Sequence, residues 1–476
     1  MPPSGLRPSS LPGSPSSPRI PGGFLRSRRS RRRLIGVAAA LLGAGLLPAC
    51  GGSAADGAPA AQPAGAPAAI RLSVWADVQD WDVYTAMIED FQQAHPTIKV
   101  TGEQYTGQGV SYYDKMQTLF AANEAADVNY FQGWIWQPYA LQGLLLAVDP
   151  LMGKDKAMQR VVPSNYEAQS KLRGKTYMLT ADTGPMVIFY NKESFDRAGV
   201  PYPKDGWTLD DLVDKARKLT RQDAGAQYWG YQVNGGYLRN FPWIRLNGAR
   251  EWDRIVEPKK SQWDNANVAK ELQLQLGDLI NRFRVAPPRT GAPAEQNHIQ
   301  FGFAAMKMEG PWFLPRMWGP KASREGGLQY DVATMPRGTQ QHAVHLQHGH
   351  TVNAKTSHQD ASWEFVKWVA SDQGQRRIAE GGRMCNLPEN NEQLWGPLAS
   401  KGYNFQNVQA FLQTQRSGSI NVVGGVSEAQ ITRDGGLGPA INDILDGKAT
   451  AKEALAVAHP KIQALLDEYW ARQGGR

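Results

Sequence analysis

Tryptophan is the residue type whose placement in this chain suggests a specific chemistry. All 15 Trp residues follow residue 74, and several are grouped with polar side chains. One group holds Trp75, Asp77, Gln79, Asp80 and Trp81, and a second holds Asp127, Gln132, Trp134 and Trp136. An indole face stacks on the apolar C–H face of a sugar, and Asp, Asn, Gln and Arg side chains pair with the hydroxyl groups at its edge. Such groups predict a binding surface for a polyol.

The competing interpretation is that the indoles belong to the protein core. Trp207, Trp363 and Trp368 occur at a helix start or on regular helical faces, which favours the core for these three. The spacing of Trp134 and Trp136 leaves both interpretations open, because both rings could point into one core layer.

Motifs of known enzyme classes are missing from the sequence. There is no Gly-x-Ser-x-Gly and no His-Glu-x-x-His, and Gly174-Lys175-Thr176 lacks the upstream Gly of a phosphate-binding loop. The carboxylates of Asp77 and Asp80 could mimic the acid pair of a glycosidase. A secreted glycan-active hydrolase is therefore the alternative to a binding protein, and a lipid-anchored lectin without a permease is a third class.

Four His residues fall within nine positions, at His342, His345, His348 and His350. Neutral imidazole is the commonest metal ligand, but the spacing fits no pair on one helix and no carboxylate is adjacent. We expect a solvated loop here, with a ligand contact by His348 or His350, or a zinc or copper site, as alternatives. No metal and no cofactor is predicted. Cys385 is expected to be a buried, unreactive thiol.

Charge and length bound the class of protein. The chain has 476 residues, enough for two or three domains, and a formal charge of +8. Residues 1–49 contain eight Arg, no Lys and no acid, so the remainder has 44 basic and 44 acidic residues. A neutral body lacks the basic surface that a nucleic acid backbone requires. Two Cys also exclude a disulfide framework and a multi-Cys metal domain.

Residues 1–49 have the pattern of an export signal. Ser30-Arg31-Arg32-Arg33-Leu34-Ile35 resembles the twin-arginine signal. The apolar run 34–47 has 14 residues, which is short for a membrane span and typical of a signal peptide. It ends in Leu47-Pro48-Ala49-Cys50, which resembles a bacterial lipobox, so lipidation is predicted at Cys50. The alternative is a permanent membrane anchor with an unmodified Cys.

Residues 50–69 are predicted to be a flexible linker, since they are rich in Ala, Gly and Pro. From residue 70 the hydrophobic period alternates between that of strands and that of helices. Strands are predicted at 70–75, 98–101, 127–131, 177–179 and 186–190, and helices at 82–94, 113–122, 138–145, 209–220, 361–370, 375–380, 438–445 and 451–469. This alternation predicts an α/β protein of two lobes, with parallel or mixed sheets.

Five groups of residues occur in the order found in one known family. They are Tyr113-Asp114-Lys115-Met116-Gln117-Thr118; Phe189-Tyr190-Asn191-Lys192 with Gly206-Trp207-Thr208; Phe301-Gly302-Phe303-Ala304-Ala305-Met306 with Glu309-Gly310-Pro311-Trp312; Ala361-Ser362-Trp363-Glu364-Phe365-Val366-Lys367-Trp368; and Asp446-Gly447-Lys448 with Lys452-Glu453-Ala454-Leu455. Together they resemble the extracellular solute-binding proteins of bacterial ABC importers, in the carbohydrate branch that includes maltose-binding protein.

This resemblance implies a two-lobed, type II periplasmic-binding-protein-like fold, with mixed sheets flanked by helices and a ligand cleft at the hinge. The N-terminal lobe is expected from residues 70–181 and 335–378, and the C-terminal lobe from residues 182–334 and 379–476. The implied function is not enzymatic: a lipid-anchored, monomeric substrate-binding subunit of an ABC transporter captures a sugar or oligosaccharide. It would act at the periplasmic or cell-surface face and deliver its ligand to membrane permease subunits.

The resemblance also suggests which residues meet the ligand. Trp312, after Gly310-Pro311, matches the family's stacking Trp, and Trp243 lies where maltose-binding protein presents another aromatic residue. Asp182 and Thr183 lie at the first crossing between the lobes. The expected ligand contacts are Trp75, Asp77, Gln79, Asp80, Trp81, Asp127, Gln132, Trp134, Trp136, Asp182, Thr183, Trp243, Trp312 and His350.

Overall fold

The computed structural model describes residues 67–76, 78–106, 109–155, 158, 161, 167–289, 298–318, 329–403, 405–420 and 424–474. The predicted export signal, the lipidation site Cys50 and the linker up to residue 66 lie outside these ranges. All of the described residues belong to one compact unit, which contains both sheets described below.

A seven-stranded mixed sheet contains the first predicted strand next to one of its edges. Strand β1 (Ala68–Trp75) lies between β2 (Ile98–Tyr105) and β3 (Val128–Gln132) and is parallel to both. Strand β12 (Val344–Val352) pairs antiparallel with β3 and with β6 (Met178–Pro185). Two short strands, β13 (Met384–Cys385) and β14 (Ser419–Ile420), pair with β6 and β12. The mixed sheet that the alternation predicted is confirmed.

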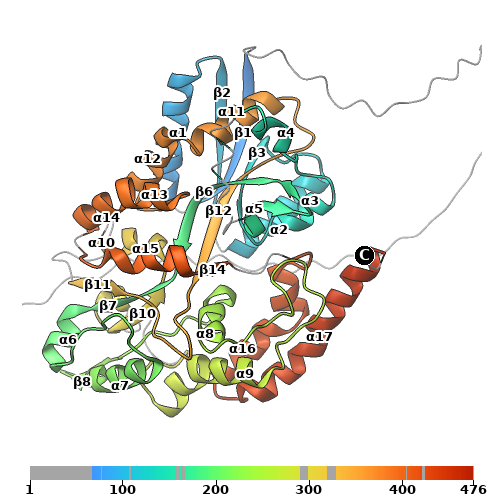
Figure 1. Cartoon of the computed structure of the whole chain (residues 1–476). Coiled ribbons are helices and arrows are strands. Elements are labelled where there is room, and N and C mark those ends of the chain that lie inside the picture. The colour runs from blue at the N-terminus through green and yellow to red at the C-terminus, as the bar shows by residue number, and fades with distance from the viewer. Residues whose placement is uncertain are drawn as a thin grey trace, which may run out of the picture. The chain divides into compact units, whose positions relative to one another are not determined.

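Helices pack on this sheet through separate apolar clusters. Side chains of α1 (Val78–Ala94) and α11 (Gln359–Val369) share one buried cluster with β1, and α12 (Asp372–Glu380) follows them. Side chains of α2 (Gly109–Ala121) and α3 (Gln137–Leu141) belong to another cluster. Figure 1 shows α1 and α12 on one side of the sheet and α2 and α3 on the other. The shorter elements nearby are α4 (Asp149–Met152), α5 (Glu167–Ser170), β4 (Lys171–Leu172) and β5 (Lys175–Thr176).

A second, three-stranded sheet is antiparallel. Strand β7 (Val187–Asn191) lies between β10 (Met306–Glu309) and β11 (Tyr330–Ala333). The remaining helices are α6 (Lys192–Ala198), α7 (Leu209–Leu219), α8 (Asn240–Leu246), α9 (Ala266–Leu272), α10 (Leu314–Trp318), α13 (Pro388–Asn390), α14 (Gly396–Tyr403), α15 (Val408–Ser417), α16 (Leu437–Leu445) and α17 (Ala451–Arg472). Residues Gln273–Arg282, Asn391–Trp395 and Gln430–Asp434 form π-helical turns, and β8 (Arg221–Asp223) pairs with β9 (Ala226–Tyr228).

The two sheets are joined directly by the chain. Only Met186 separates β6 of the first sheet from β7 of the second. After β11 the chain returns to the first sheet through β12 (Figure 1). Residues 384–385 pair with β6 and residues 419–420 pair with β12, and the lobe boundaries given above stay a prediction. The first sheet is therefore assembled from segments spread over more than 350 residues.

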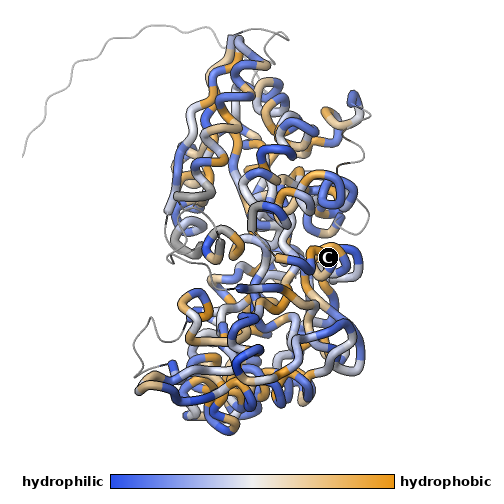
Figure 2. The backbone as a smooth tube through the Cα atoms, turned by 90° about the vertical axis from the view of Figure 1, so that its left-hand side faces the viewer, coloured by the Kyte–Doolittle hydropathy of each residue, from blue (hydrophilic) through white to orange (hydrophobic). Residues whose placement is uncertain are grey.

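Local sequence signals account for several element ends. Thr208 caps α7 and forms a reciprocal capping box with Asp211, while Arg217 and Lys218 lie in the last turn of that helix. The predicted helix 138–145 is shorter than expected and ends at Leu141, since Gly143 adopts a φ of +71° that ends the turn. Figure 2 shows polar and apolar residues alternating along the helices, as amphipathic packing requires.

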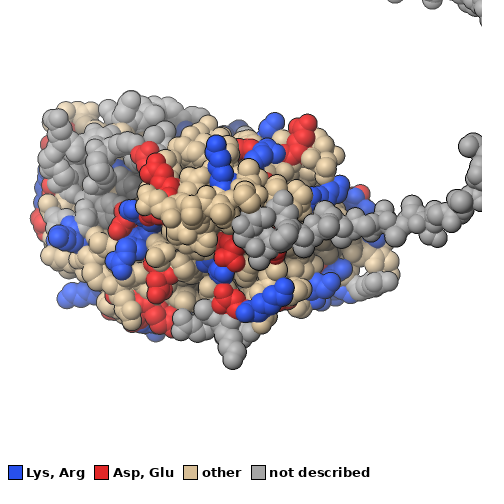
Figure 3. All heavy atoms as spheres, turned by 90° about the horizontal axis from the view of Figure 1, so that it is seen from above, with Lys and Arg blue, Asp and Glu red and all other residues tan. Residues whose placement is uncertain are grey.

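The surface carries mixed charge. On the face seen in Figure 3, Lys and Arg side chains are interspersed with Asp and Glu. Within the described ranges, none of the helices combines the length and apolar composition that a membrane crossing needs.

Candidate functional site

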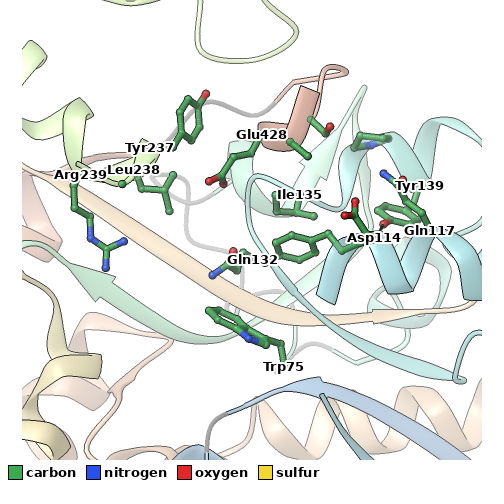
Figure 4. Close-up of a pocket in the computed structure, with 15 residues that line it drawn as sticks. Trp75, Asp114, Gln117, Gln132, Ile135, Tyr139, Tyr237, Leu238, Arg239 and Glu428 are labelled. Carbon is green, nitrogen blue, oxygen red and sulfur yellow. Dashed lines mark hydrogen bonds between the residues drawn. The ribbon is translucent and has the colours of Figure 1, made fainter. Parts of the chain in front are cut away.

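A pocket of about 210 Å³ is lined by five separate stretches of the chain. Its lining residues are Trp75; Tyr113, Asp114 and Gln117; Gln132, Ile135, Pro138 and Tyr139; Gly236, Tyr237, Leu238 and Arg239; and Ser427, Glu428 and Ala429. Figure 4 shows aromatic rings and polar side chains from these stretches facing a common space. The pocket thus brings together residues that are more than 350 positions apart in the sequence.

One wall of the pocket follows from the topology of the first sheet. Trp75 and Gln132 are the last residues of the parallel neighbours β1 and β3. Ligands of α/β proteins commonly bind outside the carboxyl ends of parallel strands. Tyr113, on α2, donates its hydroxyl proton to Oε1 of Gln132 and so fixes the orientation of that amide. This leaves the amide nitrogen of Gln132 as a donor on the pocket wall.

A turn before α8 supplies the second wall. The side-chain oxygen of Asn234 accepts a hydrogen bond of 3.0 Å from the backbone N–H of Gly236. The 3₁₀ turn Tyr237–Arg239 follows immediately, and it places three consecutive side chains against the pocket. Side-chain amides that bond two residues ahead are a usual way to start such turns.

The third wall is held by a reciprocal cap at residues 427–430. The hydroxyl of Ser427 accepts from the backbone N–H of Gln430 at 3.2 Å, and Oε1 of Gln430 accepts from the backbone N–H of Ser427 at 3.0 Å. This cap fixes the turn that carries Glu428, whose carboxylate lies between Leu238 and Ile135 in Figure 4. Oε2 of Glu428 accepts a hydrogen bond of 3.1 Å from Nε1 of Trp134. Burial raises the pKa of Glu428 above its ordinary value, against the opposing effects of Trp134 and Arg239.

Arg239 connects the pocket to a buried acid behind it. Its guanidinium donates to Oε2 of Glu309 at 2.8 Å, and Lys307 lies 3.3 Å from the other carboxylate oxygen. Trp312 donates from Nε1 to Glu309 at 3.0 Å, and the Arg239 guanidinium lies 5.1 Å from a ring centroid of Trp312. Burial alone would raise the pKa of Glu309, but the charges of Arg239 and Lys307 outweigh it and hold that pKa at about 2.

Some predicted ligand contacts lie at or beside this pocket. Trp75 and Gln132 line it directly. Trp134 lies behind the lining and donates a hydrogen bond to the lining residue Glu428. Trp312 likewise lies behind the lining, against the guanidinium of Arg239. The ring of Trp312 lies against Gly184 and Gly310, where an added Cβ would overlap the indole.

Other predicted contacts lie away from the lining. Asp127 accepts from the backbone N–H of Arg71, and Trp81 packs over Gly102. Trp136 is fully buried and donates to the carbonyl of Gln169 at 2.8 Å, and Trp243 is fully buried in the same apolar cluster. These positions follow the core interpretation of the indoles. Asp77 lies outside the described residues, and the side chains of Gln79 and Asp80 are not among those described.

Asp182 and Thr183 lie on β6, where the first sheet meets the second. Asp182 accepts from Nδ1 of His348 at 2.7 Å, and Arg383 lies 3.3 Å from the same carboxylate oxygen. Burial would raise the pKa of Asp182, but Arg383 and His348 lower it to about 2. Thr183 donates its hydroxyl proton to the carbonyl of Cys385 at 3.0 Å.

The expectation of a solvated loop is wrong for three of the four His residues, whereas His342 precedes β12 and is half-buried. His345, His348 and His350 lie on β12 and are buried, because β12 runs inside the sheet between β3 and β6. His350 packs against the rings of Tyr84 and Tyr130, and burial lowers its pKa to about 4. The described part of the chain holds no group of three His, Cys, Asp or Glu residues placed to bind a metal ion.

Sequence reasoning missed four pocket residues that this arrangement makes prominent: Tyr113, Tyr237, Arg239 and Glu428. Tyr113 appeared only as part of a family segment. The Ser427-x-x-Gln430 spacing, a capping-box pattern, is the one signal that marks the turn carrying Glu428. No pattern in the sequence indicates that this turn contacts Trp134.

The chain matches the model of the bacterial extracellular solute-binding protein family over residues 76–376, so it belongs to that family. A relative from Brucella abortus (strain 2308), named as a candidate binding protein, is 25% identical over 227 residues. These residues are 47% of this chain and 53% of the relative, so the match spans about half the length of that protein.

Solved structures share the fold across most of the chain. The ABC substrate-binding protein Lmo0181 from Listeria monocytogenes, in complex with cycloalternan, has a TM-score of 0.72 and 20% identity over 86% of this chain and 99% of its own. MalE3 of T. maritima, bound to maltose, has a TM-score of 0.70 and 17% identity over 84% and 100%. The GacH receptor of Streptomyces glaucescens, solved unliganded and with acarbose, has a TM-score of 0.70 and 21% identity over 84% and 99%. The predicted two-lobed, type II periplasmic-binding-protein fold is thereby confirmed.

Proposed function

We propose that this chain captures a carbohydrate between its two lobes and delivers it to the permease of an ABC importer. The observation that carries the proposal is the composition of the pocket. The rings of Trp75, Tyr113 and Tyr237 line it, and Gln132 and Glu428 supply hydrogen-bonding groups on its walls. Aromatic faces for the C–H surface of a sugar and polar groups for its hydroxyls thus come from both sides of one space.

The energetics favour an aromatic anchor. Micromolar affinity corresponds to about 8 kcal/mol. Each hydrogen bond to a sugar hydroxyl replaces one to water and contributes about 1 kcal/mol net. One indole face that covers roughly 80 Å² of C–H surface contributes about 2 kcal/mol. Trp75 is the indole that lines the pocket directly, so we assign it this role.

The solved relatives support a carbohydrate as the ligand class. The three described above were crystallised with cycloalternan, maltose and acarbose. These ligands differ in size and shape, so they support carbohydrate as the ligand class. The particular sugar depends on the pocket of this chain.

Export and anchoring complete the proposal. The Arg31-Arg32 pair would direct the folded chain across the membrane, and lipidated Cys50 would hold it, as a monomer, on the periplasmic or cell-surface side. Replacing both Arg by Lys should leave full-length precursor in the cytoplasm. Cys50→Ser should release the protein from the membrane fraction. Retention of Cys50→Ser after a high-salt wash would instead identify residues 34–47 as a permanent anchor.

The binding proposal is tested by thermal shift and titration calorimetry of the purified protein against mono- and oligosaccharides. A ligand at one hundred times its Kd should add about 2.7 kcal/mol of stability. Trp75→Ala should weaken binding at least tenfold, whereas the matched control Trp470→Ala, on α17 and outside the pocket, should not. Released reducing ends would identify a hydrolase. A chain that no sugar stabilises would contradict the proposal.

A further inference from the structure

Glu428 is a pocket carboxylate with little compensation from its own protein. In the described part of the chain, the Trp134 indole is the one side chain that donates a hydrogen bond to it. Arg239 shares the pocket, but its ion pair at 2.8 Å is with Glu309. No ion pair within 4 Å joins Arg239 to Glu428 among the described residues. The negative charge of Glu428 therefore faces the pocket.

The lining as a whole is acidic. Its charged residues are Asp114, Glu428 and Arg239, which gives a formal net charge of −1. Asp114 is exposed on α2 and is accessible to water, so solvent screens it. Glu428 is partly buried beside Ile135 and Leu238, so water screens it less (Figure 4). The two acids thus differ in how strongly each would attract a positive charge.

The aromatic rings of the pocket also favour a positively charged ligand. Trp75, Tyr113 and Tyr237 line the space that Glu428 faces. The face of an aromatic ring attracts a cation as well as the C–H surface of a sugar. A neutral hydroxyl gains less from a ring face than a cation does, so these rings would add to the attraction that Glu428 exerts on an ammonium group.

Desolvation decides between a neutral and a positively charged ligand. A ligand that fills the pocket displaces water from Glu428, and a carboxylate that loses its water without a counter-charge is costly. Sugar hydroxyls replace the lost hydrogen bonds but leave the charge uncompensated. An ammonium group replaces the lost hydrogen bonds and also supplies the counter-charge.

We propose that Glu428 selects carbohydrates that carry a positively charged amino group, with Trp75, Tyr113 and Tyr237 surrounding that group. The inference rests on the proposed function of the pocket as a carbohydrate site, and it names the ligand class within it. Glu428 is then the specificity-determining residue, and Trp134 positions its carboxylate through the 3.1 Å hydrogen bond.

Titration calorimetry of the purified full chain at pH 7 tests the inference with matched probes. Each pair differs only at C2: glucosamine with glucose, galactosamine with galactose and mannosamine with mannose. We expect the amino sugar of at least one pair to bind at least tenfold more tightly than its partner. Glu428→Gln should abolish that preference and leave the affinity for the neutral sugar within threefold. The control Asp114→Asn should keep most of the preference.

The outcomes separate this inference from the proposed function. If neutral sugars bind as tightly as their amino counterparts in every pair, Glu428 accepts hydroxyl protons and the inference is overturned, while the proposed function stands. The same holds if Glu428→Gln weakens both members of a pair equally. If no member of any pair binds, and maltotriose and chitotriose do not bind either, the proposed function fails together with the inference. Unchanged melting of Glu428→Gln without ligand shows that the variant is folded.

Discussion

The indole N–H of Trp134 donates a 3.1 Å hydrogen bond to the carboxylate of Glu428, across a separation of 294 residues. Trp134 follows β3 of the first sheet, and Glu428 begins the short helical segment 428–434 that precedes α16. The same indole meets the ring of His348 in an edge-to-face arrangement with 5.9 Å between centroids, and His348 in turn bonds to Asp182. Side chains in contact thus connect a pocket wall with strands β6 and β12, where the chain passes between the sheets.

A double-mutant cycle should detect this bond. Trp134→Phe keeps an aromatic ring and removes the donor, which leaves a partly buried carboxylate without its hydrogen bond and costs about 1–3 kcal/mol. In a Glu428→Ala background the same change should cost much less, because no carboxylate remains. Urea unfolding of the four proteins gives the coupling energy. Additive effects would show that the bond contributes nothing to stability.

Trp312 should influence sugar binding through Arg239. Trp312→Phe removes the donor to Glu309 and the indole beneath the guanidinium. We expect about tenfold weaker sugar binding, or 1.4 kcal/mol, because Arg239 loses its fixed position in the pocket. Trp395→Phe is the matched control, since Trp395 is a buried indole outside the lining. Calorimetry should show its affinity within twofold of wild type, and an equal loss in both variants would contradict the role given to Trp312.

Stability should fall in acid because of two buried carboxylates. The pKa values of Glu309 and Asp182 are lowered to about 2, from ordinary values of 4.5 and 3.8. Their contribution is complete above about pH 5 and is lost as the pH falls toward 2, with each worth on the order of 2–3 kcal/mol.

Glu428 has the opposite effect on the pH dependence of stability. Its raised pKa makes the folded protein bind a proton more readily than the unfolded chain, so its protonation in acid favours the folded state. The acid titration is therefore best followed by urea unfolding in a Glu428→Gln background. Asp182→Asn should flatten the decline between pH 4 and pH 2. An unchanged decline in that variant would show that other acids govern it.

Cys385 should be unreactive until the protein unfolds. Its side chain is fully buried, and burial, aided by the charge of Asp182, raises its pKa to about 12. A thiol reagent at pH 8 should label Cys385 in the Cys50→Ser protein only after denaturant is added. Labelling in the native state at the rate of a free thiol would contradict the burial of this residue.

Much of the fold was predictable because the periodic signals were strong. The strand predicted at 70–75 and the helix predicted at 82–94 correspond to β1 and α1. The buried strand β12 was missed because polar residues interrupt it, and His345, His348 and His350 suggested a solvated loop. Their burial follows from pairing with β3 and β6 on both edges, which no local pattern reveals.

The pocket was less predictable than the fold. Residues at the ends of the predicted strands, Trp75 and Gln132, were among the expected ligand contacts and line the pocket. Tyr237, Arg239 and Glu428 lie on turns without hydrophobic period, so their approach to those strand ends depends on how distant segments pack. Trp136 and Trp243 illustrate the converse, since an indole suited to stacking on a sugar is equally suited to filling a core.

The pairing of β14 with β12 has a consequence for synthesis of the protein. The first sheet needs Ser419 and Ile420 for its last strand, although it begins at Ala68. A ribosome must therefore release almost the whole chain before that sheet can close, so folding of this sheet is completed only at the end of translation. An unfolded-chain translocase would thread such a protein before any of its β-sheet order was complete. Arg31 and Arg32 suggest a route that exports folded proteins. Such a route would allow the chain to fold completely in the cytoplasm before export.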